Sequence, residues 1–160
     1  MTKECFTQEI LSLSDTMYGV SRTYLRSYAD CADAVQESIL KAWAGLPALH
    51  KEQYFRTWVI RILINECKNI LKKQMRTVSV ADFPEPAILT ETDNALYETM
   101  MALEEKYRVP LVLYHCEGYS VQEIAKILYL PKGTVTSRLA RGREILKRDY
   151  QLREVCFDER

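Results

Sequence analysis

A chain of 160 residues with 48% hydrophobic composition can bury a core as one domain or as two small ones, which excludes wholesale disorder. The 22 basic and 22 acidic side chains give a formal net charge of zero, which argues against an indiscriminate coat for nucleic acid. No apolar run approaches the roughly 18 residues needed to cross a bilayer, and the first residues lack a signal-peptide hydrophobic region, so we expect a cytoplasmic protein.

Three helices are predicted in the first half of the chain. Apolar residues recur at helical intervals over residues 7–28, with Gly19 as one weak point. Asp30 can cap a second helix that ends around Gly45 and Pro47, and a third helix runs from residue 54 to about residue 73. Its inward side would hold Phe55, Trp58, Val59, Ile62, Leu63, Cys67, Ile70 and Leu71. These helices would close a small bundle.

The helical pattern fails over residues 74–93. This stretch contains two prolines and four acidic residues and has no sustained period. We interpret it as a flexible linker between a domain at residues 1–73 and a domain at residues 94–160. No segment shows convincing strand alternation, so both domains are predicted to be all-α.

The second half contains a clear helix start. Helical spacing returns with Leu96, Met100 and Leu103 and again around residues 109–116. Ser120 and Glu123 then form an S-x-x-E capping box, which marks the first residue of a helix. The next helix is predicted to follow a turn made by Pro131 and Gly133, with Thr134 as its N-cap and Val135, Leu139 and Ile145 or Leu146 facing inward.

Two segments are strongly basic although the whole chain is neutral. Residues 132–148 hold six basic side chains and one acidic one, and residues 61–76 hold five and one. A polar, positive second helix after a tight turn is the pattern of a helix-turn-helix reader of DNA. Two basic segments in separate domains predict two contacts with nucleic acid.

Cysteine usage gives no sign of a metal centre. The five cysteines are odd in number and widely spaced, without a C-x-x-C pair and with only two histidines in the chain. They are Cys5, Cys31, Cys67, Cys116 and Cys156. We expect free, mostly buried thiols in a reducing compartment, no metal and no other cofactor.

Three motifs in order resemble one family. They are the run DAVQESILKAW at residues 33–43, the run FRTWVIRILIN at residues 55–65, and the run YSVQEIAKILYLPKGTVTSRLARGRE at residues 119–144. Together they resemble bacterial RNA polymerase sigma factors of the extracytoplasmic-function (ECF) type, over roughly residues 10–150. Such proteins keep only sigma regions 2 and 4, two small helical domains on a flexible linker. The resemblance therefore implies a promoter-specificity subunit that is not an enzyme.

The resemblance also implies which residues meet each partner. The clamp coiled coil of the large subunit of core RNA polymerase would be bound by Asp33, Gln36, Glu37, Lys41 and Trp43. The minus-10 element of promoter DNA would be met, as it opens, by His50, Lys51, Tyr54, Arg61, Asn65, Lys68, Asn69 and Lys72. The minus-35 duplex would be met by Lys132, Thr134, Thr136, Ser137, Arg138 and Arg141. An anti-sigma factor that can hold the protein at a membrane is a further implied partner.

Some positions depart from the family pattern. Ala34, Ala140 and Gly142 stand where other residues are common. Because glycine in a helix interior costs roughly 1 kcal/mol relative to alanine, we expect the last helix to fray or hinge at Gly142.

Other interpretations stay open. Phe55 and Trp58 are better explained as core anchors than as base-stacking residues, and Arg61, Lys72 and Lys73 could line an ordinary solvated face. An ordinary DNA-binding regulator would share the second half but need no docking helix. A small helical enzyme is the third alternative, but neither His50 nor His115 has a partner at catalytic spacing.

Overall fold

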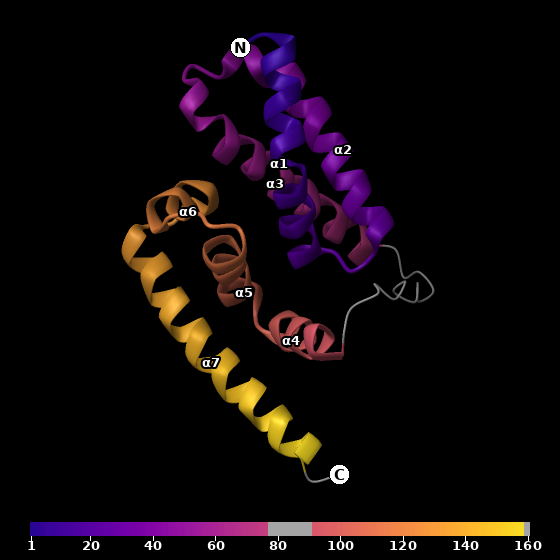
Figure 1. The fold of residues 1–160 in the computed structure, drawn as a ribbon. Helices are drawn as coiled ribbons and strands as arrows, with labels where there is room; N and C mark the ends of the chain where they lie inside the picture. The colour runs from indigo at the N-terminus through magenta and orange to yellow at the C-terminus, as the bar shows by residue number, and fades with distance from the viewer. Residues whose placement is uncertain (77–90, 159–160) are drawn as a thin grey trace. The chain divides into compact units, whose positions relative to one another are not determined.

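The computed structural model describes residues 1–76 and 91–158, and these residues form helices connected by short segments, with no strand among them. The chain divides into two compact units (Figure 1). The first holds α1, α2 and α3, and the second holds most of the residues from α4 to α7. The all-α prediction is confirmed.

The first unit is a three-helix bundle. It consists of α1 (Lys3–Tyr24), α2 (Tyr28–Gly45) and α3 (Phe55–Arg76), and two short 3-10 turns, η1 (Leu46–Ala48) and η2 (Glu52–Tyr54), lie between α2 and α3. Its core has side chains from all three helices, among them Met17, Val35 and Leu63, each at most 2% exposed.

The ends of the first two helices differ from the prediction. Helix α1 begins four residues earlier than expected, because the Thr2 hydroxyl accepts a hydrogen bond from the Cys5 N–H at 3.2 Å. It also ends at Tyr24, and the chain turns through the buried, extended Leu25. Ser27, and not Asp30, caps α2, since its hydroxyl accepts from the Asp30 N–H at 3.4 Å. The earlier start places Phe6 in the core.

An aromatic cluster joins the three helices of the first unit. The Phe6 ring meets Phe55 edge-on at 5.6 Å and Trp43 at 5.0 Å, and Phe55 lies 6.2 Å from Trp58. Phe55 is 1% exposed, as predicted for a core anchor, whereas Trp58 is half-buried. Such edge-to-face pairs add to the apolar burial that stabilises the bundle.

Helices extend into both ends of the segment predicted to be a linker. Helix α3 continues through Gln74, Met75 and Arg76, and α4 begins at Glu91. The remainder of the predicted linker, residues 77–90, lies outside the described residues.

Two of the four cysteines whose side chains the structure describes are buried. Cys31 and Cys67 lie in the first unit's core, while Cys5 and Cys116 are exposed, and all four are free thiols. Burial raises the pKa of Cys67 to about 12, so this thiol stays protonated at neutral pH. In the described part of the chain, no group of three or more histidine, cysteine, aspartate or glutamate side chains could hold a metal ion. No helix in that part is both long and apolar enough to span a bilayer.

The second unit begins with two short helices joined by an arginine. Helix α4 (Glu91–Ala102) is followed by α5 (Glu105–Leu111), which continues as a π-helical segment, η3 (Val112–Cys116). The Arg108 guanidinium donates to the Leu103 carbonyl at 2.7 Å and to the Met101 carbonyl at 3.3 Å, and so binds carbonyls at the end of α4. Leu96, one of the residues with the predicted helical spacing, is 46% exposed, and Thr99 is buried in α4.

The next two helices, α6 (Val121–Leu128) and α7 (Lys132–Asp158), form the predicted helix-turn-helix. The capping box is confirmed: the Ser120 N–H donates to the Glu123 carboxylate at 2.8 Å, and the Glu123 N–H donates to the Ser120 hydroxyl at 3.1 Å. The predicted turn is wrong in detail. Tyr129, with a left-handed φ of 55°, ends α6, while Gly133 and Thr134 lie inside α7.

Gly142 is a point of close packing and not a hinge. Helix α7 continues through it without a break, and Gly142 is buried against α5. A Cβ at this position would lie 2.9 Å from Leu111 Cδ1 and 3.3 Å from Tyr107 Cβ. Glycine therefore allows α5 and α7 to approach closely, which the sequence pattern could not show.

Candidate protein and nucleic-acid interfaces

Helix α2 presents a polar face to solvent. Asp33, Gln36 and Glu37 are all exposed and lie on one side of the helix because they are three and four residues apart. Leu40 lies one turn further along the same side and is 64% exposed. Sequence analysis missed Leu40, although an apolar residue outside the inward stripe was the available signal. An acidic and amide face with an exposed leucine is suited to bind another protein.

Lys41 is tied to the interior of the first unit. Its ammonium lies 2.6 Å from Oε1 of Glu66 on α3 and 3.7 Å from Oε1 of Glu37 on α2. Glu66 is 8% exposed, and its carboxylate raises the pKa of Lys41. Trp43 is 45% exposed and packs edge-on against Phe6. Lys41 and Trp43, two residues of the predicted polymerase-binding set, therefore also have a structural role.

A polar, basic face runs along α3. Asn65, Lys68, Asn69 and Lys72 are exposed, and their spacing of three and four residues places them on one side of the helix. Arg61 lies at the start of this face and is half-buried, and burial lowers its pKa. Amides that can bond base edges thus alternate with cations that can bind phosphates.

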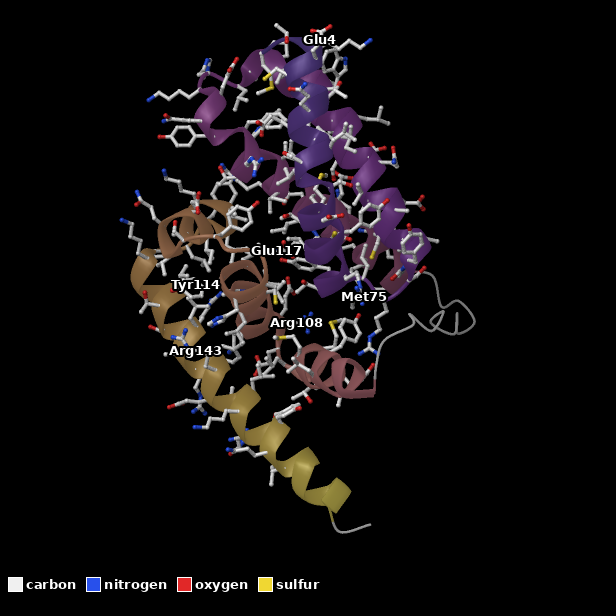
Figure 2. All side chains as sticks on the ribbon, in the orientation of Figure 1. Glu4, Met75, Arg108, Tyr114, Glu117 and Arg143 are labelled. Carbon is white, nitrogen blue, oxygen red and sulfur yellow. The ribbon has the colours of Figure 1, made fainter. Side chains whose placement is uncertain are left out.

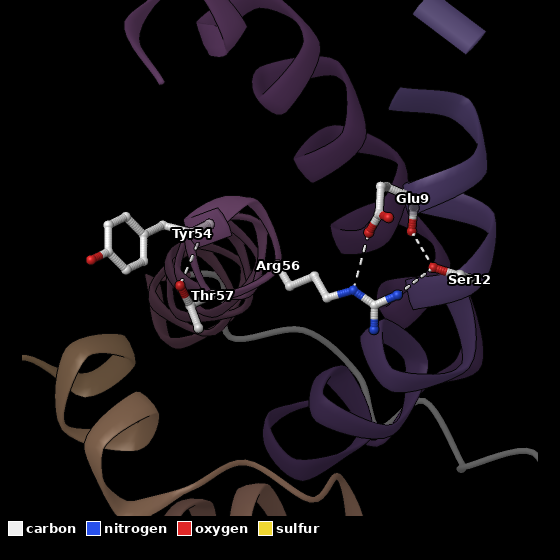
Figure 3. A network of polar contacts seen from close by, with 5 residues as sticks. All are labelled: Glu9, Ser12, Tyr54, Arg56 and Thr57. Carbon is white, nitrogen blue, oxygen red and sulfur yellow. Dashed lines mark hydrogen bonds and ion pairs between the residues drawn. The ribbon is translucent and has the colours of Figure 1, made fainter. Parts of the chain in front are cut away.

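The segment before α3 is exposed but anchored. His50, Lys51 and Tyr54 are all exposed on or beside the two 3-10 turns. The Arg56 guanidinium donates to the Glu9 carboxylate at 3.0 Å and to the Ser12 hydroxyl at 2.8 Å, which ties the first turn of α3 to α1 (Figure 3). The Thr57 hydroxyl donates to the Tyr54 carbonyl at 3.0 Å in the same view.

These anchoring bonds join residues 47 and 44 positions apart, so no local pattern could predict them. The chain's first amino group adds another long-range contact, 2.6 Å from the Glu52 carboxylate. The segment is therefore held at its end while its outer side chains stay accessible.

The first turns of α7 carry the predicted reading residues. Lys132, Thr136, Ser137 and Arg141 are exposed, while Thr134 and Arg138 are half-buried. The Thr136 hydroxyl donates to the Lys132 carbonyl at 3.0 Å and the Ser137 hydroxyl to the Gly133 carbonyl at 2.8 Å, so each hydroxyl keeps its acceptor capacity. Arg141 pairs with Glu144 at 3.1 Å on the surface.

Arg143 belongs to the same helix but was outside the predicted set. Its side chain points from α7 toward η3 in Figure 2, and its Nη1 lies 3.3 Å from Nε2 of His115. This contact of His115 could not be predicted from local sequence patterns, because the two residues are 28 positions apart.

Comparison with known proteins defines the class. The family description "Sigma-70 region 2" matches residues 10–77, and "Sigma-70, region 4" matches residues 93–146. Together these matches cover most of the chain, including the α2, α3 and α7 faces. They define a transcription initiation factor of the sigma-70 type.

Full-length relatives narrow the class further. An ECF RNA polymerase sigma-E factor from Haemophilus influenzae is 30% identical over an alignment of 169 positions, which covers 93% of this chain and 89% of the relative. The ECF RNA polymerase sigma factor SigW from Bacillus subtilis is 28% identical, over 96% of this chain and 91% of the relative. The chain belongs to the ECF group of the sigma-70 family, which supports promoter-specific initiation of transcription with RNA polymerase.

Solved structures share the fold. The sigma factor RpoE from Bartonella quintana, solved with the anti-sigma factor NepR, superposes with a TM-score of 0.76 at 23% identity, over 91% of this chain and 96% of that one. CnrH, solved with the cytosolic domain of CnrY, gives 0.73 at 21% identity, over 94% and 90% of the two chains.

Proposed function

We propose that this chain divides promoter recognition among three helical faces. The α2 face binds core polymerase, the α3 face with the segment before it binds the minus-10 element as the strands separate, and the first turns of α7 read the minus-35 duplex. The observation that carries the proposal is that the exposed basic faces lie on α3 and α7, in the two segments that match sigma regions 2 and 4. The domains would be residues 1–73 and 94–160, joined by a linker.

The α2 face suits the clamp coiled coil of the polymerase large subunit. Asp33 and Glu37 supply negative charge on a helix that is packed in the bundle, and Leu40 adds apolar area at the same place. Complementary charge speeds the encounter and sets orientation, while a buried apolar contact slows dissociation. Gln36 lies between the two acids and can bond to a backbone or side-chain partner.

The α3 face suits DNA whose bases have left the stack. Asn65 and Asn69 can donate and accept on base edges, and Arg61, Lys68 and Lys72 can hold phosphates. An unstacked base also needs a pocket to enter. One side of this pocket could be formed by His50, Lys51 and Tyr54 on the anchored segment before α3. Single-strand capture at this face would assist strand opening.

The α7 face suits a major groove. Arg141 can bond a guanine in two places, and the hydroxyls of Thr136 and Ser137 can accept or donate at base edges. Lys132, Thr134 and Arg138 would instead contact the DNA backbone. Releasing Arg141 from Glu144 costs little, because exposed ion pairs contribute at most about 1 kcal/mol.

An anti-sigma factor is a proposed further partner. The two solved structures compared above are complexes, one with the anti-sigma factor NepR and one with the cytosolic domain of CnrY. A partner of this kind would hold the protein inactive in the cytoplasm, and a membrane-bound one would hold it at the membrane.

Transcription in vitro tests the proposal directly. Purified chain and core polymerase would be given a genomic library, and the transcription start sites would be sequenced. We expect start sites that share two upstream sequence elements. A chain that does not bind core polymerase but binds duplex DNA would instead be an ordinary DNA-binding regulator.

Charge reversal tests the docking face. Asp33→Arg with Glu37→Arg should abolish co-purification with core polymerase, because two attractions become repulsions. Glu4→Arg with Asp15→Arg makes the same charge change on exposed positions of α1 and should leave co-purification intact. Retained binding by the α2 variant would refute the assignment of that face.

Base discrimination tests the reading helix. Arg141→Ala should lose about 1–3 kcal/mol of discrimination at one base pair of the upstream element. Arg148→Ala, further along α7 and paired with Asp149, is the control. An equal loss for all sequences, with a shallower salt dependence, would make Arg141 a phosphate contact.

A further inference from the structure

We propose that Lys41 is a positioning residue: through Glu66 it fixes α3 on α2, so that the DNA-binding face keeps a set position relative to the polymerase-binding face. The family resemblance assigned Lys41 to the polymerase-binding set, and we propose instead that Lys41 acts without touching either partner. This inference rests on the proposed function of the two faces.

The contact between Lys41 and Glu66 has the geometry of a strong bridge. The ammonium and the carboxylate are 2.6 Å apart, and the two residues are 25 positions apart on different helices. The side chain of Glu66 is only 11% exposed, whereas that of Lys41 is 48% exposed. The carboxylate is thus nearly removed from water, and the lysine reaches inward from the surface to neutralise it.

The buried side of α2 explains why a bridge is needed. Ala34, Ser38 and Ala42 recur every four residues and are all 0% exposed, and Ser38 turns its hydroxyl back onto the Ala34 carbonyl at 2.6 Å. Gly45 lets Trp58 of α3 approach, since a Cβ there would lie 3.2 Å from Trp58 Cζ2. Small side chains allow close helix contact but offer few knobs that fix its register.

An ion pair whose carboxylate is buried and whose lysine is half-exposed can supply the missing register. Such pairs add little net stability compared with apolar side chains of similar volume, and fixing a helix register is their best-attested use. A second long-range bond, from the Gln74 amide to the Asp30 carboxylate at 2.6 Å, joins the same two helices near their other ends. That bond is exposed, so the Lys41–Glu66 bridge is the more shielded of the two.

The bridge lies beside the residues proposed to meet DNA. Asn65 directly precedes Glu66 on α3, and Lys68 follows two residues later. On α2, Glu37 of the proposed docking face is 3.7 Å from the same ammonium. A shift of α3 by one residue is about 1.5 Å along the helix, which is more than the range of a good hydrogen bond.

The test compares variants of the full chain that change the bridge in different ways. Lys41→Met with Glu66→Leu replaces both charges by apolar side chains of similar size. Lys41→Glu with Glu66→Lys reverses the pair and keeps an ion pair between the same positions. Core-polymerase affinity would be measured by fluorescence anisotropy and open-complex formation by permanganate footprinting, while tryptophan fluorescence would report folding.

At concentrations of core polymerase that saturate each variant, we expect the apolar pair to open promoters about tenfold more slowly than the parent, because a displacement near 1 Å is enough to misplace reacting groups. The reversed pair should recover most of the opening rate. A merely structural role would instead leave opening unchanged once the apolar pair is shown to be folded.

Three results would overturn the proposal. One is parent-like opening by the folded apolar pair. Another is an equal loss of polymerase affinity in both double variants, which would mean that the lysine contacts polymerase directly. The third applies if the apolar pair fails to fold. The reversed pair is then the test, and slow promoter opening by the reversed pair refutes the positioning role of Lys41. A parent chain that does not bind core polymerase would be a failure of the proposed function and is recognised separately.

Discussion

Different kinds of polar contact stabilise the inside of each unit of this protein. In the first unit, Glu9–Arg56, Asp30–Gln74 and Lys41–Glu66 join residues 47, 44 and 25 positions apart on different helices. In the second unit, the polar bonds that begin α6 and connect α4 to α5 join residues at most seven positions apart, while the Arg143–His115 contact joins residues 28 positions apart.

This difference matches what each unit is proposed to do. Polymerase and opening DNA would meet the first unit on two different helices, so their relative placement must be fixed by contacts that cross the bundle. A helix-turn-helix needs one helix in one groove, so local capping and a single close helix crossing are sufficient. The following substitutions break or sharpen the comparison.

Phe6→Ala should have the largest effect on stability. It removes a 6% exposed ring that contacts both Phe55 and Trp43, and such truncations cost about 3–5 kcal/mol. The chain's two tryptophans, Trp43 and Trp58, both lie in the first unit, so urea unfolding followed by tryptophan fluorescence isolates this loss. Leu11→Ala, at a 70% exposed position on the same helix, should change stability by less than about 0.5 kcal/mol.

Gly142→Val should have the next largest effect, in the second unit. Any Cβ at this position already meets Leu111 and Tyr107, and overpacking of this kind costs about 1–3 kcal/mol. Gly133→Ala in the same helix has no atom within 4 Å of the new Cβ and should be neutral or stabilising. Thermal unfolding by far-ultraviolet circular dichroism gives both values, and an unaffected Gly142→Val would mean that α5 and α7 are not closely packed.

Ser120→Ala should destabilise the second unit by about 1 kcal/mol, because it removes the acceptor for the Glu123 N–H. Ser120→Asp keeps an acceptor at the N-cap and should retain most of the stability. If the first unit, followed by tryptophan fluorescence, lost as much stability as the second, the local character of this contact would be refuted.

Tyr129→Gly should have the smallest effect and the opposite sign. Tyr129 is held at a φ of 55° and is 75% exposed, so glycine relieves backbone strain and gives up little packing. Relief of the left-handed conformation, worth roughly 1–2 kcal/mol, is partly offset by the greater freedom of glycine in the unfolded chain, so we expect a net gain of about 0.5–1 kcal/mol in chemical denaturation. Gly118→Ala, at the other left-handed position among the described residues, with a φ of 74°, is the matched control and should lose stability. Destabilisation by Tyr129→Gly would show that the tyrosine ring makes a needed contact.

Part of the candidate site was predictable from single positions. Exposure of Asp33, Gln36, Asn65 and Arg141 followed from helical spacing, because a residue opposite an apolar stripe must face solvent. Leu40 was missed since an exposed leucine contradicts that rule. The anchoring of Arg56 and the burial of Glu66 were missed because their partners are remote in the chain.

The sequence by itself determined the helical class, the helix-turn-helix start at Ser120 and the family, since capping and periodicity act over three or four residues. The tertiary structure alone decided the close packing of Gly142, the ion pair of Lys41 and the burial of Phe6. From the sequence, a glycine in a helix is interpreted as a weak point, although another helix can pack closely against it. A surface lysine is likewise interpreted as unpaired, although a buried carboxylate can bind it. The physical reason is that packing and charge neutralisation depend on which helices touch, and local patterns do not record that.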